Sequence, residues 1–448
     1  MKKINEIIKD TKNSDSKFLV IIFIFLLAIH IPWINLQGVS AGDTSGYIDV
    51  SKRWFSSDLI YFRPVMYPVF IFLAKVIGSG VFGAIVYIQT IFYAMSGVLF
   101  YKLLIQQNVR FNKLLLLGLV LISFSVPQAL QMNEVILPEM IPLFFILLLF
   151  YFILKPASLK NSFIIPIILI IVILMKPLWL LLLAFPVIKY IYSDKGLKNL
   201  IYGMVIPLTI TVLLYSFNQY LVAKETPNQV TASTLDVNTN LSLIRMGLID
   251  GSKNTKLNSY LDSKKLTKEI SQRTWTNKDN EFSNFTKIKN QIPWEFREDS
   301  GFWKSILFKN TDNLISYSSF QLSRLPVFFS TSGENARVKF LPDLLNSIYQ
   351  RFYSNVHSKH IVGVSFLIFS CIISLFNFKN LTIHKILSFL IIGVSVVLCL
   401  LTYQNPHFLR MRAVIEPLII YTALYTLLRI STFIYERFFL KERLSPNI

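Results

Sequence analysis

Long runs of apolar residues organise this sequence, and they limit what the chain can fold into. Most of these runs are about 17–25 residues long, the length that an α-helix needs to cross the hydrocarbon core of a bilayer. With 53% hydrophobic residues among 448, a soluble fold would have more apolar surface than one core can bury. In hydrocarbon, each backbone amide needs a hydrogen-bond partner within its own segment. The sequence therefore predicts an all-α polytopic membrane protein.

The apolar runs predict about ten transmembrane helices. The expected spans are 18–38, 82–105, 113–130, 138–154, 162–175, 178–192, 199–221, 360–377, 383–402 and 412–430. The chain then divides into an N-terminal membrane module (1–221), a large loop (222–358) and C-terminal membrane helices (359–448). The first loop covers 39–81, and its segments 44–55 and 64–78 have the apolar spacing of helices that lie in the membrane interface.

The formal charge of +20 does not indicate nucleic-acid binding, because the Lys and Arg residues lie mostly at the ends of the apolar runs. Cations crowd the N-terminal segment, alternate short loops and the C-terminal tail, as in Lys2, Lys3, Lys9, Lys155, Lys160, Lys195, Lys198, Lys379, Arg437 and Arg443. By the positive-inside rule, both termini are cytoplasmic and both long loops are extracytoplasmic. The frequent use of Lys, Ile and Asn indicates an AT-rich genome and hence a bacterium. The expected membrane is therefore the bacterial plasma membrane. Val39-Ser40-Ala41 resembles a signal-peptidase site, but the long apolar stretch before it favours an uncleaved first span.

A small set of charged residues departs from this topology pattern and is the candidate functional set. All lie on the predicted extracytoplasmic side: Asp43, Arg63, Glu139, Lys176, Arg410 and Arg412, with Glu134 close to Glu139. An ionisable group near the hydrocarbon costs free energy, so it is retained either because it is paired or because it acts. Cations that bind phosphate, beside a carboxylate that takes a proton, suit a phosphate-bearing lipid substrate.

Each of these residues also has a purely structural interpretation. Asp43 can be the N-cap of a following helix. Arg412 and Glu416, spaced i,i+4, can form an ion pair. Lys176 before Pro177 can extend from a tight hairpin towards water, and Glu134 can be a solvated loop residue. The five histidines have no metal-ligand spacing.

Several short motifs, in order along the chain, resemble those of the GT-C membrane glycosyltransferases, in particular the protein O-mannosyltransferase and aminoarabinose transferase-like branch. The matching residues are Asp43 and Tyr47 after the first span, Arg63-Pro64 with Tyr67-Pro68, Glu139 in NEVILPEM, Lys176-Pro177, and Arg410-Met411-Arg412 with Pro417. The stretch FWKSILFKNTDNLISYSSFQLSRL is similar to the amphipathic segment that precedes the later spans in that family. The resemblance covers most of the chain except the polar part of the large loop. It implies a GT-C-like fold.

The resemblance also implies an activity and a role for each residue. A sugar moves from a polyprenyl-phosphate donor to a glycan, lipid or protein of the cell envelope, with inversion at the anomeric carbon. Asp43 is then the general base and Glu139 the second acid, while the donor phosphate is bound by Arg63, Lys176, Arg410 and Arg412. Tyr47, Asp49, Tyr67 and Glu134 contribute to the substrate site. The resemblance implies no required cofactor. Binding of a divalent cation is an alternative that it leaves open, because Thr44 stands where part of the family has a second acid.

Two other functions are alternatives to a transferase. A lipid or oligosaccharide transporter, or flippase, predicts charges at mid-membrane and two matching halves with broken helices, which the sequence does not show. A polysaccharide polymerase or ligase also uses polyprenyl-linked glycans at this surface. Such enzymes depend on arginines and a histidine in large loops, whereas here an acid directly follows the first span.

Overall fold

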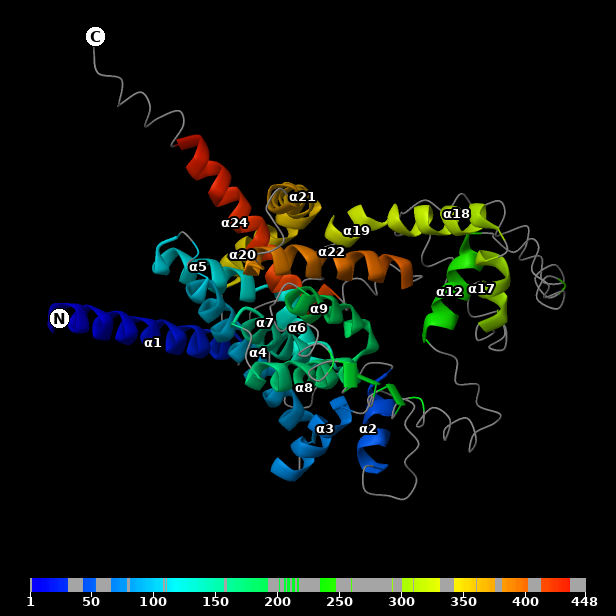
Figure 1. Ribbon diagram of the computed structural model, residues 1–448, viewed down its shortest axis with the longest axis horizontal. Helices are drawn as coiled ribbons and strands as arrows, with labels where there is room; N and C mark the ends of the chain where they lie inside the picture. Colours follow the sequence, from blue (N-terminus) through cyan, green and yellow to red (C-terminus); the bar gives the residue numbers. More distant parts are fainter. Residues whose placement is uncertain are drawn as a thin grey trace, which may run out of the picture. The chain divides into compact units, whose positions relative to one another are not determined.

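The three-dimensional structure is a computed structural model, shown in Figure 1. It describes residues 2–30, 43–53, 66–78, 81–107, 109, 111–156, 159–191, 201, 205–206, 208–209, 212–213, 216, 234–246, 259, 292, 300–308, 310–330, 342–359, 361–374, 381–401 and 412–435. The elements of this described part are all helices. The chain forms two compact units. The first comprises Met1–Ser216, Ser332–Ile392 and Ala413–Ile448, and the second comprises Phe217–Thr331 and Gly393–Arg412.

Apolar helices of membrane-crossing length agree with the predicted class of all-α membrane protein. In the described residues, three helices are long and apolar enough to cross a membrane: Gly83–Gln106 within α4 (Val81–Gln106), α22 (Ile383–Leu401) and α24 (Glu416–Tyr435). A bent pair, α5 (Lys113–Phe124) and α6 (Pro127–Glu134), is a fourth if both helices belong to one span. Shorter apolar helices coincide with other predicted spans, as in α7 (Ile141–Ile153), α8 (Leu159–Met175) and α21 (Ile361–Ser374). The total of about ten spans stays a prediction, and span 199–221 lies mostly outside the described residues.

Prolines explain why two of the predicted spans are shorter or broken. The predicted span 113–130 is interrupted, since α5 ends at Phe124 and α6 begins at Pro127 with its axis bent by 54°. Proline has no backbone N–H and clashes with the preceding turn, so it favours the start of a helix, although α8 keeps Pro166 in its interior. Residues 135–140 are likewise non-helical and contain Pro138, and α7 begins at Ile141 with Pro142 in its first turn. The second break contains the candidate acid Glu139.

The first loop contains the two helices expected there. α2 (Thr44–Arg53) and α3 (Met66–Ile77) coincide with the predicted segments 44–55 and 64–78. The two helices pack against each other. α3 has 12 residues, fewer than the roughly 17–25 that a membrane span requires. Its length is therefore consistent with the interfacial position that the sequence predicts.

α4 is the central helix of the first unit. It packs against α1 (Lys2–His30), α3, α5 and α7. Gly97 lies at the contact with α1, where an added Cβ atom would overlap Leu26 Cδ1 and lie 3.3 Å from Ile22 Cγ2. In a bilayer, small residues at helix contacts allow the backbones to approach closely. A side chain at this position would therefore require the end of the Leu26 side chain to move.

Buried polar contacts tie α20 (Asp343–Ser358) to the membrane helices of the first unit. His357 Nε2 lies 2.6 Å from Glu416 Oε1 in the first turn of α24, and both side chains are buried. The Tyr353 hydroxyl donates to the carbonyl of Ile122 over 2.5 Å, and the Tyr349 hydroxyl donates to the carbonyl of Ser125. The last carbonyls of a helix have no partner within it. The tyrosines of α20 therefore supply partners at the point where α5 ends.

The second unit is built from α12 (Thr234–Arg245), α17 (Ser300–Leu307), α18 (Thr311–Leu322) and α19 (Leu325–Ser330). α17 and α18 lie within the amphipathic stretch 302–325 that was singled out in the sequence, apart from the first two residues of α17, and α19 begins at its last residue. Trp303 Nε1 donates to Asp236 Oδ1 over 2.7 Å and joins α17 to α12. The Tyr317 hydroxyl donates to the carbonyl of Leu400 over 2.8 Å and joins α18 to the C-terminal part of α22.

Candidate functional site

A buried ion pair is the central feature of the candidate site. Lys176 Nζ lies 3.1 Å from Glu139 Oε1, and the two side chains are 15% and 1% exposed. Both residues were selected from the sequence, as a phosphate ligand and as the second acid. The structure brings them together across 37 residues of sequence. Burying two charges is costly, and their attraction offsets this cost only when the geometry is good.

Each member of the pair lies at a proline-induced break. Glu139 follows Pro138 in the non-helical segment between α6 and α7. Lys176 lies between α8 and the short 3₁₀ helix η1 (Pro177–Leu183), with extended backbone angles of φ −159° and ψ 120°. The ring of the following Pro177 disfavours helical angles at Lys176. Because α8 packs against α7 and η1, the two breaks are brought together and the side chains meet.

Gln89, in the middle of α4, connects the helices around this pair. Its Oε1 accepts a hydrogen bond from the Tyr67 hydroxyl over 2.8 Å. Its Nε2 donates to the carbonyls of Asn133 (2.8 Å) and Val135 (3.0 Å). Gln89 is completely buried. One amide side chain thus links α3 to the segment that leads to Glu139, and it provides partners for carbonyls at the end of α6, where the helix stops.

The start of α2 is attached to the same segment. The Thr44 hydroxyl donates to the carbonyl of Ile136 over 3.0 Å. Asp43 immediately precedes α2, and its carbonyl accepts from the amide of Tyr47. Asp43 therefore has the position of an N-cap residue, as the structural interpretation expected. The side chain of Asp43 is half-buried, so the candidate base lies between the protein interior and the surface.

Tyr47 and Tyr67 belong to the apolar core on which the ion pair rests. Their rings meet edge to face with centroids 5.2 Å apart, in a buried cluster with Ile71, Leu137 and Met175. Burial raises the pKa of the Tyr67 phenol well above its ordinary value, and the charge of Glu139 raises it further. Tyr67 therefore stays protonated and can serve as the donor to Gln89.

The structure does not bring every predicted site residue into this group. Asp49 lies on the exposed side of α2, where its carboxylate is 59% exposed and pairs with Lys52 over 3.2 Å. Glu134 is the last residue of α6 and is half-buried. Arg63 and Arg410 lie outside the described residues. Their predicted role in phosphate binding stays a prediction.

Arg412 belongs to the second unit, where it is completely buried. Its guanidinium donates to the carbonyl of Phe328 and lies 5.8 Å from the centre of that ring. Arg324, between α18 and α19, is a second fully buried guanidinium, and its Nη1 donates to Gln321 Oε1 over 2.6 Å. Arg412 was predicted from the sequence as a site residue, whereas Arg324 was not.

Gln89 was likewise not predicted from the sequence. The sequence does contain a feature that points to Gln89, because a glutamine within the apolar run 82–105 places a polar group inside the membrane. Such groups are expensive and are usually paired or functional. For Arg324, an arginine in an amphipathic segment is usually solvated, so its burial cannot be derived from the segment alone.

Within the part of the chain that the structure describes, no three His, Cys, Asp or Glu side chains come together as metal ligands. No ligand set for a divalent cation is therefore assigned there. Comparison with protein-family models, with curated proteins and with solved structures finds no match to this chain.

Proposed function

We propose that this chain is a membrane glycosyltransferase of the GT-C type that uses a polyprenyl-phosphate sugar. The observation that carries the proposal is the buried Glu139–Lys176 pair, in which the ammonium lies 3.1 Å from the carboxylate. The hydrogen bond from Thr44 to Ile136 attaches the start of α2, and with it Asp43, to the segment that holds Glu139. A second acid, a cation and a half-buried acid therefore come from separate segments of the first unit.

The proposed reaction is an in-line displacement at the anomeric carbon. The acceptor hydroxyl or amine attacks this carbon, its proton passes to the Asp43 carboxylate, and the bond from carbon to phosphate oxygen breaks. Polyprenyl phosphate leaves with the bonding electron pair, and the anomeric configuration inverts. Positioned proton transfer of this kind contributes about 10²–10⁴ in rate.

Fixed cations have a clear role in this reaction. The leaving phosphate gains negative charge, and preorganised positive groups stabilise that charge best where water is excluded. Lys176 supplies a compact ammonium. The guanidinium group of Arg63 is proposed as a further ligand, because its fork geometry matches phosphate oxygens. Glu139 holds Lys176 in place and orients the acceptor. A divalent cation is not required for charge balance in this scheme.

One observation favours a transporter as a second candidate function. α5 and α6 form a helix pair that is bent by 54° at a short break, and discontinuous helices around a polar site are a feature of secondary transporters. In that function the Glu139–Lys176 pair would be a binding element for a charged solute or lipid headgroup. The test of the proposed transferase therefore also measures the passage of labelled lipid or solute across the bilayer.

The proposal is tested by measuring sugar transfer in proteoliposomes. The donors are radiolabelled polyprenyl-phosphate sugars, and membrane extract supplies the acceptor. We expect the wild type to move label into a new product, and Asp43→Asn to reduce turnover by about 10²–10⁴ because the general base is lost. Asp312→Asn, the same change at an exposed position of α18, should keep turnover within about twofold, the range of surface substitutions.

The result that contradicts this assignment is normal turnover in Asp43→Asn with intact protein. Size-exclusion profiles and thermal unfolding of both variants show whether the fold is retained. Passage of labelled lipid or solute across the bilayer without consumption of the donor would establish the transporter instead.

A further inference from the structure

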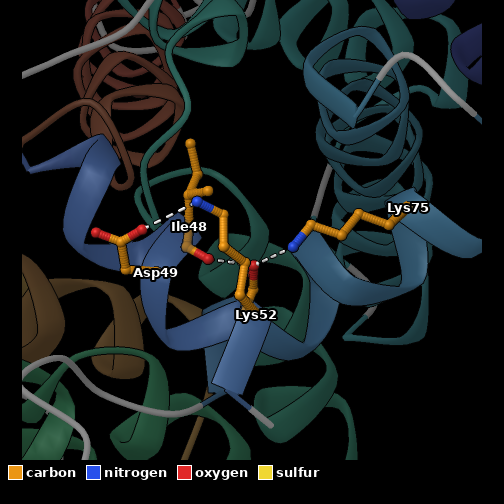
Figure 2. Close-up of polar contacts among 5 residues, drawn as sticks. Ile48, Asp49, Lys52 and Lys75 are labelled. Carbon is orange, nitrogen blue, oxygen red and sulfur yellow. Dashed lines mark hydrogen bonds and ion pairs between the residues drawn. The ribbon is translucent and has the colours of Figure 1, made fainter.

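A buried pair of a histidine and a glutamate lies outside the proposed catalytic group. His357 Nε2 of α20 and Glu416 Oε1 of α24 are 2.6 Å apart, and their side chains are 3% and 0% exposed. The Asp49–Lys52 pair of α2, shown in Figure 2, is a contrasting case, because its side chains are 59% and 62% exposed. Water and salt screen an exposed pair but have little access to a buried one. The charges of His357 and Glu416 therefore interact with little screening.

The attachment of α20 to the first unit relies on polar contacts. Besides His357, the hydroxyls of Tyr349 and Tyr353 contribute, since they donate to backbone carbonyls at the end of α5. These three residues are spaced four apart, so they share one side of the helix. Several apolar side chains of α20 are not packed inside but are between 42% and 73% exposed: Leu344, Leu345, Ile348 and Phe352. The contact between His357 and Glu416 is therefore one of a few that fasten this helix.

The imidazole of His357 is the group of this pair whose charge changes in the ordinary pH range. When His357 is protonated and Glu416 is ionised, a charge-assisted hydrogen bond joins α20 to α24. Such a bond is roughly twice as strong as a neutral one. When the pH rises and the imidazole loses its proton, a neutral donor can remain, but the attraction between the charges is lost. The attachment of α20 is therefore stronger on the acidic side of this titration and weaker on the alkaline side.

The other ionisable groups around the pair keep a constant charge between about pH 6 and 9. Tyr93 of α4 lies close enough to interact with the charge of Glu416, and its hydroxyl donates to a backbone carbonyl over 2.8 Å. Arg412 donates to the carbonyl of Phe328, and a guanidinium is not deprotonated in proteins. α21 has no ionisable side chain from Ile361 to Ser370. Those on the described parts of α5, α6, α20 and α24, apart from the tyrosines and the pair itself, are carboxylates and cations: Lys113, Glu134, Asp343, Arg351, Lys359 and Arg429.

We propose that the His357–Glu416 pair is a pH-sensitive latch that fastens α20 to α24 and to the end of α5. As the pH rises through the titration of His357, α20 opens more often, and the carbonyls at the bend between α5 and α6 lose the tyrosines that donate to them. On the predicted topology, α20 belongs to the extracytoplasmic loop, so the latch responds to the pH outside the cell. The inference does not depend on the transferase proposal.

The test measures how often α20 opens, with no turnover. Backbone hydrogen exchange of the purified full-length protein in detergent is followed by mass spectrometry between about pH 6 and 9, the range around the titration of histidine. The rates are corrected for the intrinsic pH dependence of exchange, so that they report local opening. We expect the protection of α20 to fall about tenfold across this range, the difference between a charge-assisted and a neutral hydrogen bond.

Variants of the pair should change this pH dependence in opposite ways. His357→Gln keeps a hydrogen-bond donor for Glu416 but has no proton to gain or lose, so the protection of α20 should become independent of pH. Glu416→Gln should reverse the sign, because a protonated His357 is then buried without its carboxylate and α20 opens more often at acidic pH. Glu416→Gln therefore tests the latch even if His357→Gln does not fold.

Two control variants change a histidine and an ion pair elsewhere. His384 of α22 is half-buried and stacks on Tyr425 with ring centroids 4.3 Å apart. His384→Gln should keep the pH dependence of the wild type. Lys52→Gln breaks the exposed pair of α2 and should also leave the exchange of α20 unchanged.

Three results would overturn the proposal. The first is a protection of α20 in the wild type that is constant across this pH range. The second is an unchanged pH dependence in His357→Gln or in Glu416→Gln. The third is an equal loss of pH dependence in His384→Gln, which would assign the effect to histidines in general.

Discussion

Replacing Lys176 with methionine is expected to destabilise the protein by about 3–5 kcal/mol, the cost of removing one partner from a buried ion pair. Methionine keeps most of the aliphatic length of lysine, so the change removes the charge with little loss of packing. The Glu139 carboxylate, with a side chain only 1% exposed, then lacks its ammonium partner. The measurement is the free energy of unfolding in mixed detergent and SDS micelles, followed by tryptophan fluorescence.

Glu139→Gln should cost less than Lys176→Met, because the two sides of the pair are not equally buried. The Lys176 side chain is 15% exposed, and a long lysine can move its ammonium towards water while its stem stays in apolar surroundings. The double variant Glu139→Gln/Lys176→Met should recover part of the loss, since no buried charge is left without a partner. A double-mutant cycle measures this coupling.

Lys52→Met is the matched control for the ion pair. Lys52 and Asp49 form a pair of similar length, 3.2 Å, but their side chains are 62% and 59% exposed. Exposed pairs are worth roughly 0–1 kcal/mol because water and salt screen them. Equal losses in Lys176→Met and Lys52→Met would show that the Glu139–Lys176 pair does not contribute as a buried pair.

The second large effect is expected for Gln89→Met, which should destabilise the protein by about 2–5 kcal/mol. The substitution removes the hydrogen bonds of Gln89 to the carbonyls of Asn133 and Val135 and to the hydroxyl of Tyr67. The carbonyl of Val135 keeps the amide of Leu137 as a donor. Each buried polar group that loses its partner costs about 1–3 kcal/mol, and relaxation of the non-helical segment recovers part of the sum. The same unfolding measurement applies.

Two variants make the Gln89 result specific. Thr90→Val changes the next residue, which is equally buried but donates only to Val86 in its own helix over 2.9 Å, so the expected loss is below about 1 kcal/mol. Tyr67→Phe removes one of the three hydrogen bonds of Gln89 and should cost about 1 kcal/mol. A Gln89→Met loss no larger than that of Thr90→Val would mean that the amide does not hold the segment before Glu139.

Gln89→Met should also reduce sugar transfer if the proposed function is right. The segment from Val135 to Glu139 is held from one side by Gln89 and from another by Thr44. When it loosens, Glu139 no longer holds Lys176 where the leaving phosphate gains charge. A mutation that disturbs such positioning lowers the rate even when the reacting groups are unchanged.

The helices of the first loop and the membrane class were predictable because they follow from local composition. An apolar run of sufficient length satisfies its own backbone as a helix in hydrocarbon, and the neighbours of that helix do not alter this. The break at Pro127 was also encoded locally, but the length of the apolar run 113–130 outweighed the proline in the sequence analysis. The structure shows the proline effect directly, in the end of α5 at Phe124.

The two members of the buried ion pair could be selected from the sequence, but their contact with each other could not. Glu139 and Lys176 stand out as charges near apolar runs, whatever their partners. That they form one buried pair depends on the packing of α7 and α8, and the two residues are 37 positions apart. Gln89 reaches Asn133 and Val135 from a third helix, 44 and 46 positions away.

The sequence by itself therefore determined that this chain is helical and membrane-embedded, and which charged residues have to be paired or functional. The free energy of transfer into the bilayer and the hydrogen bonding of the backbone are both determined within each segment. They can therefore be derived from the segment alone. Only the tertiary structure decided which charges are paired, that Asp49 is exposed while Tyr47 is buried, and that Gln89 holds the segment before Glu139. Hydrogen bonds and ion pairs extend over about 3 Å, so they depend on which helices become neighbours.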